Sequence, residues 1–240
     1  MSWPTVGWGL DVSMPQEPPE PPSEALFEAP SMSPAAPLAY KRPTCEATAE
    51  NPVCVTPTMK ETLEQARSEG FQAAFSDVVG QAKTYLQGIA PDSRKVVVVD
   101  LDETLVSNLP FWEKVGVYDK ACWSKWMRSP KVGYYNAPVR ELVGWAKAQG
   151  FSVMFITGRS ANDSAPTLRD LNDIEWDGTF FRPEGNDVRS QPFKAHVRQL
   201  LRDLGYEIVL NLGDQTSDFD LPIETSQGEF LVPNLIYAIP

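Results

Sequence analysis

The segment at residues 96–108, VVVVDLDETLVSN, leads four valines directly into two aspartates, Asp100 and Asp102. A run of β-branched residues is typical of a strand that is buried on both faces of a parallel sheet. Ligands of α/β proteins bind beyond the carboxyl ends of such strands. The two carboxylates could therefore act on a bound substrate, or they could be ordinary acids in a loop.

Two further apolar runs also end in polar residues. FSVMFI at 151–156 is followed by Thr157, Gly158 and Arg159, and EIVLNLG at 207–213 is followed by the acidic turn DQTSD. The carboxyl ends of parallel strands lie along one edge of a sheet. The residues that we expect to converge at that edge are Asp100, Asp102, Thr157, Gly158, Asp214 and Asp218.

Carboxylates placed this close together repel each other unless a cation lies between them. We therefore predict a metal site, and oxygen ligands without a His or Cys cluster favour Mg²⁺. The predicted ligands are Asp100, Asp102, Asp214 and Asp218. A carboxylate beside a phosphorus atom can attack it, and a second acid can donate and accept a proton. Donors for the phosphoryl oxygens would come from Thr157 and from Lys194, which begins the helix before the second acidic turn.

The rest of the chain supplies the elements that must position these residues. Hydrophobic spacing predicts helices at 58–90, 137–150, 163–173 and 192–205, and the glycines at 70 and 80 could divide the first one into two. One face of the last helix is expected to carry Val197, Leu200, Leu201 and Leu204. Strands are expected at 95–100, 151–158, 178–183 and 207–214, with strand fragments at 230–240. This alternation predicts an α/β fold, a doubly wound parallel sheet with right-handed crossovers.

Residues 1–57 differ in composition from the rest of the chain. They hold 12 of its 22 prolines, which predicts a disordered, proline-rich arm ahead of a folded domain at 58–240. The net charge of −11 opposes binding to nucleic acid polymers, and no apolar stretch is long enough to span a membrane. No signal peptide is visible, so cytoplasm is the default location, with a periplasmic or secreted protein as the alternative.

Cysteine and histidine are scarce in this sequence. Cys45 and Cys54 could form a disulfide across a short loop, or they could remain free thiols. His196 is the single histidine, and it lies two positions from Lys194, which places it on a different face of the predicted helix. We expect it at the surface without a catalytic role.

Four segments of the chain resemble the four motifs of the haloacid dehalogenase (HAD) phosphatases. These segments are DLDET at 100–104, ITGR at 156–159, Lys194, and GDQTSD at 213–218. The longer stretches around them, with the closing LVPNLIYAIP, are similar to the acid phosphatases of subfamily IIIB, which include class C enzymes and plant vegetative storage proteins. The resemblance covers about residues 60–240. Four such motifs in order, each on its expected element, are far more specific than any one of them.

The resemblance implies a HAD-like Rossmannoid sheet and a Mg²⁺-dependent acid phosphatase that works through an aspartyl phosphate. Asp100 would be the nucleophile. Asp102 would be the general acid and base, with its backbone carbonyl on the metal. Asp214 would ligate Mg²⁺ directly, and Asp218 directly or through water. Thr104 would fix the loop after the nucleophile.

The same resemblance implies that Thr157, Gly158 and Lys194 bind the phosphoryl group. Related enzymes often carry Asn before the arginine of the second motif, where this chain has Gly158. Arg159 is therefore either a substrate contact or part of a structural ion pair.

The aromatic-rich segment at about 109–135 is expected to form a small helical cap. Its rings could pack against the edge of the sheet or line the substrate pocket, and we favour packing for any single ring. A small cap leaves the site open to small phosphomonoesters, nucleotides among them. Two alternatives remain: a catalytically weak storage or binding protein on the same scaffold, or a phosphoprotein phosphatase, whose family shares DLDETLV but lacks a segment like GDQTSD.

Overall fold

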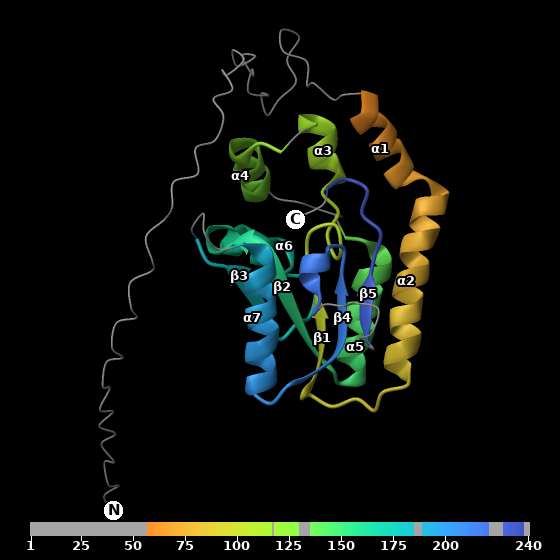
Figure 1. Ribbon diagram of the computed structural model, residues 1–240, viewed down its shortest axis with the longest axis vertical. Helices are drawn as coiled ribbons and strands as arrows, with labels where there is room; N and C mark the ends of the chain where they lie inside the picture. The colour runs from red at the N-terminus through yellow and green to blue at the C-terminus, as the bar shows by residue number, and fades with distance from the viewer. Residues whose placement is uncertain (1–56, 117, 130–134, 185–188, 221–227, 238–240) are drawn as a thin grey trace, which may run out of the picture. The chain divides into compact units, whose positions relative to one another are not determined.

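The valine run forms the central strand of a five-stranded parallel sheet (Figure 1). The computed structural model describes residues 57–116, 118–129, 135–184, 189–220 and 228–237. The strands are β1 (Lys95–Val99), β2 (Ser152–Ser160), β3 (Gly178–Arg182), β4 (Glu207–Gly213) and β5 (Glu229–Leu231). Their order is β3-β2-β1-β4-β5, and every neighbouring pair is parallel. The predicted α/β fold with a doubly wound parallel sheet is confirmed.

Helices cover both faces of the sheet, as the alternation of buried side chains in β1 requires. Val97 and Val99 belong to the core under α2 (Glu69–Gln87) and α5 (Ala137–Gln149). Val96 and Val98 pack on the other face against α7 (Ser190–Asp203). Because both faces are covered, a strand of four consecutive valines can be buried along its whole length.

The helical region predicted at 58–90 is two helices, α1 (Pro57–Arg67) and α2. The break falls at Ser68, whose side-chain oxygen accepts a hydrogen bond from the backbone N–H of Phe71 and caps α2. The glycines at 70 and 80 lie inside α2. The N-cap, and not a glycine, therefore divides this region.

The buried face of α7 differs from the prediction. Val197 and Leu201 are buried as expected, but Leu200 and Leu204 are 38% and 56% exposed. Lys194 and Arg198 take the remaining positions on the buried face. These two side chains can be buried because each has acceptor partners nearby, which the apolar spacing does not reveal. His196 is exposed, as predicted.

Two short helices, α3 (Leu109–Val115) and α4 (Lys120–Arg128), lie beyond the carboxyl ends of the strands (Figure 1). We call this pair the cap. Phe111 is its centre, with the rings of Trp112 and Trp123 edge-on at centroid distances of 5.1 Å. Leu63 of α1 packs into the same cluster. The cap is therefore anchored on α1 by apolar contacts.

The remaining helical segment between β2 and β3 is shorter than predicted. The region expected at 163–173 contains the short helix α6 (Ser164–Asp170), which follows a single 3₁₀ turn at Ala161–Asp163. After β5 the chain carries no further strand among the described residues up to 237. The predicted proline-rich arm, except Pro57, and the Cys45 and Cys54 pair lie outside the described residues. No described helix is both long and apolar enough to cross a membrane.

Candidate active site

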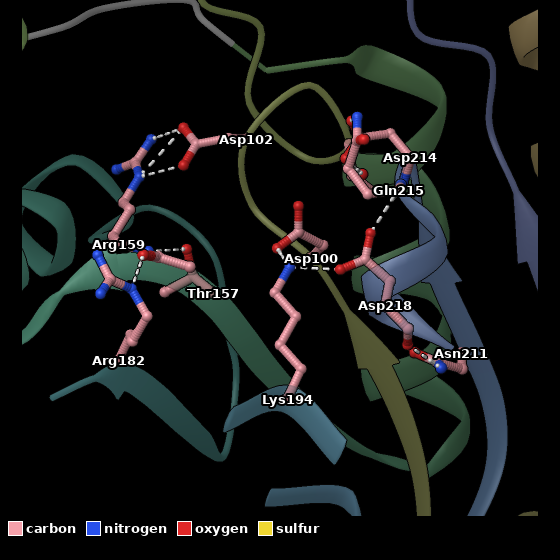
Figure 2. A network of polar contacts seen from close by, with 12 residues as sticks. Asp100, Asp102, Thr157, Arg159, Arg182, Lys194, Asn211, Asp214, Gln215 and Asp218 are labelled. Atoms are coloured by element: carbon pink, nitrogen blue, oxygen red, sulfur yellow. Dashed lines mark hydrogen bonds and ion pairs between the residues drawn. The ribbon is translucent and has the colours of Figure 1, made fainter. Parts of the chain in front are cut away.

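Three aspartates meet at the carboxyl ends of the two central strands (Figure 2). Asp100 follows β1, Asp214 follows β4, and Asp218 ends the 3₁₀ turn η2 (Thr216–Asp218). All three are buried, and each offers a carboxylate oxygen within 4.8 Å of the others. The Nζ atom of Lys194, also buried, donates to Asp100 Oδ1 at 2.7 Å and to Asp218 Oδ1.

The electrostatics of this cluster are unbalanced, because three buried carboxylates face one ammonium group. Burial and the neighbouring aspartates raise the pKa of Asp100 well above its usual value, although Lys194 opposes the shift. Burial and Asp218 likewise raise the pKa of Asp214. Burial lowers the pKa of Lys194, but the attraction of Asp100 and Asp218 outweighs it and the net shift is upward. An oxygen-only cluster with surplus negative charge fits a hard divalent cation, so it could bind a metal ion.

Asp214 is held by three hydrogen-bond donors from separate parts of the chain. The Thr104 hydroxyl donates to Oδ1 at 3.0 Å. The side-chain amides of Gln215 and Asn234 both donate to Oδ2 at 2.6 Å. Supporting donors of this kind orient a metal-ligating carboxylate.

Asp218 also shapes the loop that carries it. Its Oδ2 accepts hydrogen bonds from the backbone N–H groups of Asp214 and Gln215 at 3.1 and 2.9 Å. This carboxylate packs directly on Gly213, where an added Cβ would lie only 2.4 Å from atoms of Asp218. The glycine at the end of β4 is therefore required for Asp218 to fold back toward Asp214.

Asp102 lies on the opposite side of Asp100 from Asp214 and Asp218 (Figure 2). Arg159 Nη2 donates to Asp102 Oδ1 at 2.6 Å, and Nε donates to Oδ2 at 3.0 Å. Burial would raise the pKa of Asp102, but the guanidinium charge and hydrogen bonds of Arg159 lower it overall. Of the two alternatives for Arg159, the structure shows the ion pair, although the residue also lines the pocket.

Thr157 and Gly158 lie near the carboxyl end of β2, which continues to Ser160, two residues beyond the predicted end of the strand. The Thr157 hydroxyl is fully buried and accepts a hydrogen bond from the backbone N–H of Arg159 at 3.1 Å. Gly158 lines the pocket, and a Cβ at this position would lie 3.0 Å from the hydroxyl of Ser190. Ser190 begins α7 and fills the space that a larger residue would need, which gives a physical reason for glycine here.

A pocket of about 330 Å³ opens above these residues. Its floor includes Asp100, Asp102 and Lys194. Its aromatic walls are Trp112, Tyr118 and Trp123 from the cap region and Tyr237 from the last described residues. These three rings from the cap region therefore line the pocket as well as packing, whereas packing was the favoured prediction for any single ring. The arrangement combines a charged floor for an anion with apolar walls for whatever the anion carries.

The candidate active site also contains residues that were not predicted from the sequence. Asn108 is fully buried and donates from Nδ2 to Asp102 Oδ1 at 2.8 Å. Asn234 and Tyr237 come from a closing segment that was predicted only as strand fragments. Gln215 stands inside the recognised GDQTSD segment, so its position next to Asp214 was a usable signal. Asn108 also stands close to a recognised motif, six residues after Asp102. Asn234 and Tyr237 have no local signal, because their partners are about 20 residues away in sequence.

Glu103, between the two motif positions Asp102 and Thr104, is also buried. Its backbone φ of 58° is in the left-handed region, which is unusual for a residue other than glycine. Its carboxyl accepts hydrogen bonds from the Asn108 backbone N–H and the Trp112 indole, each at 3.3 Å. Burial, together with the charge of Asp102, raises the pKa of Glu103 to about 8.

The cap carries a covalent link in addition to its apolar contacts. Cys122 on α4 is disulfide-bonded. The sequence indicated a possible bridge between Cys45 and Cys54 and no role for Cys122. The bonded cysteine lies on α4 next to Trp123, which forms one wall of the pocket.

Comparison with known proteins gives consistent relatives. The profile of the HAD superfamily, subfamily IIIB (Acid phosphatase), matches residues 36–240. Acid phosphatase 1 of Solanum lycopersicum is 28% identical over 183 residues, covering 71% of this chain and 70% of that protein. Vegetative storage protein 1 of Arabidopsis thaliana is 29% identical over 184 residues, covering 72% and 67%. The class C acid phosphatase from Bacillus anthracis shares the fold, with a TM-score of 0.61 at 16% identity over 75% of this chain and 85% of that one.

Proposed function

The chain belongs to the acid phosphatases of HAD subfamily IIIB and is a phosphoric monoester hydrolase, and we propose that it hydrolyses small phosphomonoesters through an aspartyl phosphate on Asp100. The observation that carries this proposal is the contact of Lys194 with Asp100 at 2.7 Å, on the floor of the pocket. A cationic side chain at this point can neutralise a phosphate and orient the attacking carboxylate at the same time.

In the first step, a carboxylate oxygen of Asp100 forms a bond to phosphorus while the ester oxygen leaves. Asp102, in its protonated form at the start of this step, gives a proton to that oxygen, which departs as an alcohol. Asp102 is then a carboxylate, and Arg159 stabilises this form by a buried ion pair. In the second step, water attacks phosphorus and gives a proton to Asp102. The bond to Asp100 breaks, and inorganic phosphate leaves.

We propose Mg²⁺ as the cofactor, with Asp100, the Asp102 carbonyl, Asp214 and Asp218 as its ligands. When bound, the cation would supply positive charge that offsets the repulsion among the carboxylates and the phosphate. Thr104, Gln215 and Asn234 would orient Asp214 for this purpose. Thr157, Gly158 and Lys194 would bind the phosphoryl oxygens, and the aromatic walls would contact the leaving group.

We expect that Asp100→Asn, which keeps the size of the side chain but removes the nucleophile, abolishes turnover. The assay is hydrolysis of p-nitrophenyl phosphate from about pH 4 to pH 9, with Mg²⁺ and with EDTA, on both proteins. Circular dichroism of the variant would show that the fold is intact. Full activity in Asp100→Asn would contradict the mechanism.

A second candidate is a storage or binding protein, because similar proteins carry the name vegetative storage protein. The retained Asp100 and its contact with Lys194 count against a loss of catalysis. A wild-type protein that turns over no ester under any of the conditions above, yet binds phosphate, would favour this candidate.

We also propose that the protein resides in an oxidising compartment, the periplasmic or secreted alternative. The support is the disulfide at Cys122, since structural disulfides are rare in the cytosol. Mass spectrometry of the native protein after alkylation, with and without reduction, would test this. In the sample without reduction, Cys122 should remain unalkylated because it is bridged. Alkylation of Cys122 in that sample would contradict the proposal.

A further inference from the structure

Asn108 links the cap to Asp102 through its side-chain amide. The residue is fully buried at the start of α3. Its Nδ2 atom donates to Asp102 Oδ1 at 2.8 Å, and its Oδ1 atom accepts a hydrogen bond from the Trp126 indole at 3.2 Å. Trp126 lies on α4, so one amide connects a cap helix with the carboxylate that follows β1.

The two partners of Asn108 leave its amide only one suitable orientation. The indole of Trp126 can only donate a hydrogen bond, so it must face the amide oxygen. Asp102 in its ionised form can only accept, so it must face the amide nitrogen. A flipped amide would place oxygen against oxygen at Asp102 and nitrogen against nitrogen at Trp126. The position of α4 therefore determines which atom of Asn108 meets Asp102.

Asn108 and Arg159 hold Asp102 from different parts of the chain. Arg159 approaches from β2, and Asn108 approaches from the first residues of the cap. Arg159 is itself fixed by a hydrogen bond from Nη1 to the buried hydroxyl of Thr167 at 3.1 Å. Two independent donors define the direction of a carboxylate better than one. Proton transfer needs such definition, because the acid must lie within hydrogen-bond reach of the leaving oxygen.

We propose that Asn108 is a positioning residue for Asp102 and that Trp126 orients it, so that the cap helix α4 sets the geometry of proton transfer. The proposal rests on the proposed function, because it takes Asp102 as the general acid and base. Asn108 acts through Asp102 and is not among the residues that line the pocket.

The test compares two esters that differ in their need for an acid. p-Nitrophenoxide leaves with little help from a proton, whereas the alkoxide of glycerol phosphate needs one. We expect Asn108→Leu to lower kcat for glycerol phosphate at least about tenfold more than for p-nitrophenyl phosphate, as part of the 10²–10⁴-fold that general acid catalysis supplies. KM should change little for both. An equal loss of kcat on both esters, in a folded variant, would overturn the proposal.

Trp126→Phe provides a second variant that does not depend on the folding of Asn108→Leu. It keeps an aromatic ring on α4 but removes the indole donor, so the same selective loss on glycerol phosphate is expected, to a smaller extent. In the double variant, Trp126→Phe should add no further selectivity to Asn108→Leu. Selective losses that simply multiply would show that Trp126 does not act through Asn108. Trp145→Phe on α5, whose ring contacts Lys83 instead, is the matched control and should behave as wild type.

Failure of this proposal can be distinguished from failure of the proposed function. Wild-type protein without activity on either ester would overturn both, since no proton transfer would remain to be positioned. An active wild type that loses activity in Asp100→Asn, together with equal losses in Asn108→Leu, would overturn only the role of Asn108.

Discussion

At the scale of single residues, identical carboxyl groups in this site have different properties because their neighbours differ. Asp100 has a raised pKa, since it is buried beside other aspartates. Asp102 has a lowered pKa, since Arg159 pairs with it. The lowered pKa of Asp102 stabilises the carboxylate that remains after it has given its proton to the leaving oxygen. A cation bound among these carboxylates would favour the ionised form of Asp100, which is the form that attacks phosphorus.

The raised pKa of Glu103 predicts how the free energy of unfolding depends on pH. In the folded protein its carboxyl keeps a proton up to about pH 8, whereas its ordinary pKa is 4.5. Between these values the folded state binds more protons than the unfolded state, so the free energy of unfolding falls as pH rises. The total loss should be a few kcal/mol, since one pKa unit corresponds to about 1.4 kcal/mol. Glu103→Gln stays neutral in both states and should lose this pH dependence.

The measurement is thermal unfolding of metal-free protein in EDTA from about pH 5 to pH 8. The midpoint of wild type should decline with pH more steeply than that of Glu103→Gln. Glu141→Gln, an exposed change on α5, is the control and should follow wild type. Parallel curves for wild type and Glu103→Gln would show that Glu103 does not retain its proton.

At the scale of elements, α7 positions both sides of the acidic cluster. Lys194 reaches Asp100 directly. One turn later, Arg198 donates from Nη1 to the backbone carbonyl of Asp218 and from Nη2 to that of Phe219, both at 2.8 Å. The same helix therefore holds the loop after β4 in place. This explains why an arginine is buried where a leucine would have matched the apolar pattern.

Arg198→Leu should therefore destabilise the protein more than its neighbour Arg202→Leu. Removing Arg198 leaves the buried carbonyl of Phe219 without its side-chain donor. The carbonyl of Asp218 loses one of two donors and keeps the amide of Asn211. We therefore expect a loss of about 2–3 kcal/mol. Arg202 pairs with the half-exposed Asp220 at the surface, where a loss below about 1 kcal/mol is expected. Urea unfolding of the two variants and wild type measures both values. Equal losses would mean that Arg198 acts only as one more surface charge.

At the scale of the whole molecule, the candidate metal site joins distant parts of the chain. Asp100 and Asp214 end two different strands, and Asn234 reaches Asp214 from beyond β5. These segments meet only in the folded state. A ligand that binds only the folded state stabilises it by mass action.

Mg²⁺ should therefore raise the thermal unfolding temperature of the metal-free protein. At a concentration of 100 times Kd the gain is about 2.7 kcal/mol. Asp214→Asn should abolish this shift, and Asp77→Asn, an exposed change on α2, should preserve it. Potassium chloride at equal ionic strength separates specific binding from screening. An unchanged shift in Asp214→Asn would place the cation elsewhere.

The amino-acid sequence by itself determined the order of strands and helices and the points where functional residues follow the strands. Valine runs, helical spacing and terminal glycines are local features, and each acts within one element. For this reason the parallel sheet and the positions of Asp100, Thr157 and Asp214 at strand ends could be predicted. The break at Ser68 and the shorter α6 could not, because caps and tertiary contacts decide where a helix ends.

Only the tertiary structure decided which partners these residues have. The choice of Arg159 as the partner of Asp102, the burial of Arg198, and the amide of Asn108 between Asp102 and Trp126 all join residues from different elements. Hydrophobic periodicity records which face of an element is buried, but it does not record which polar group lies opposite. A buried polar side chain must find a partner wherever the packing brings one, and that partner is set by the fold as a whole.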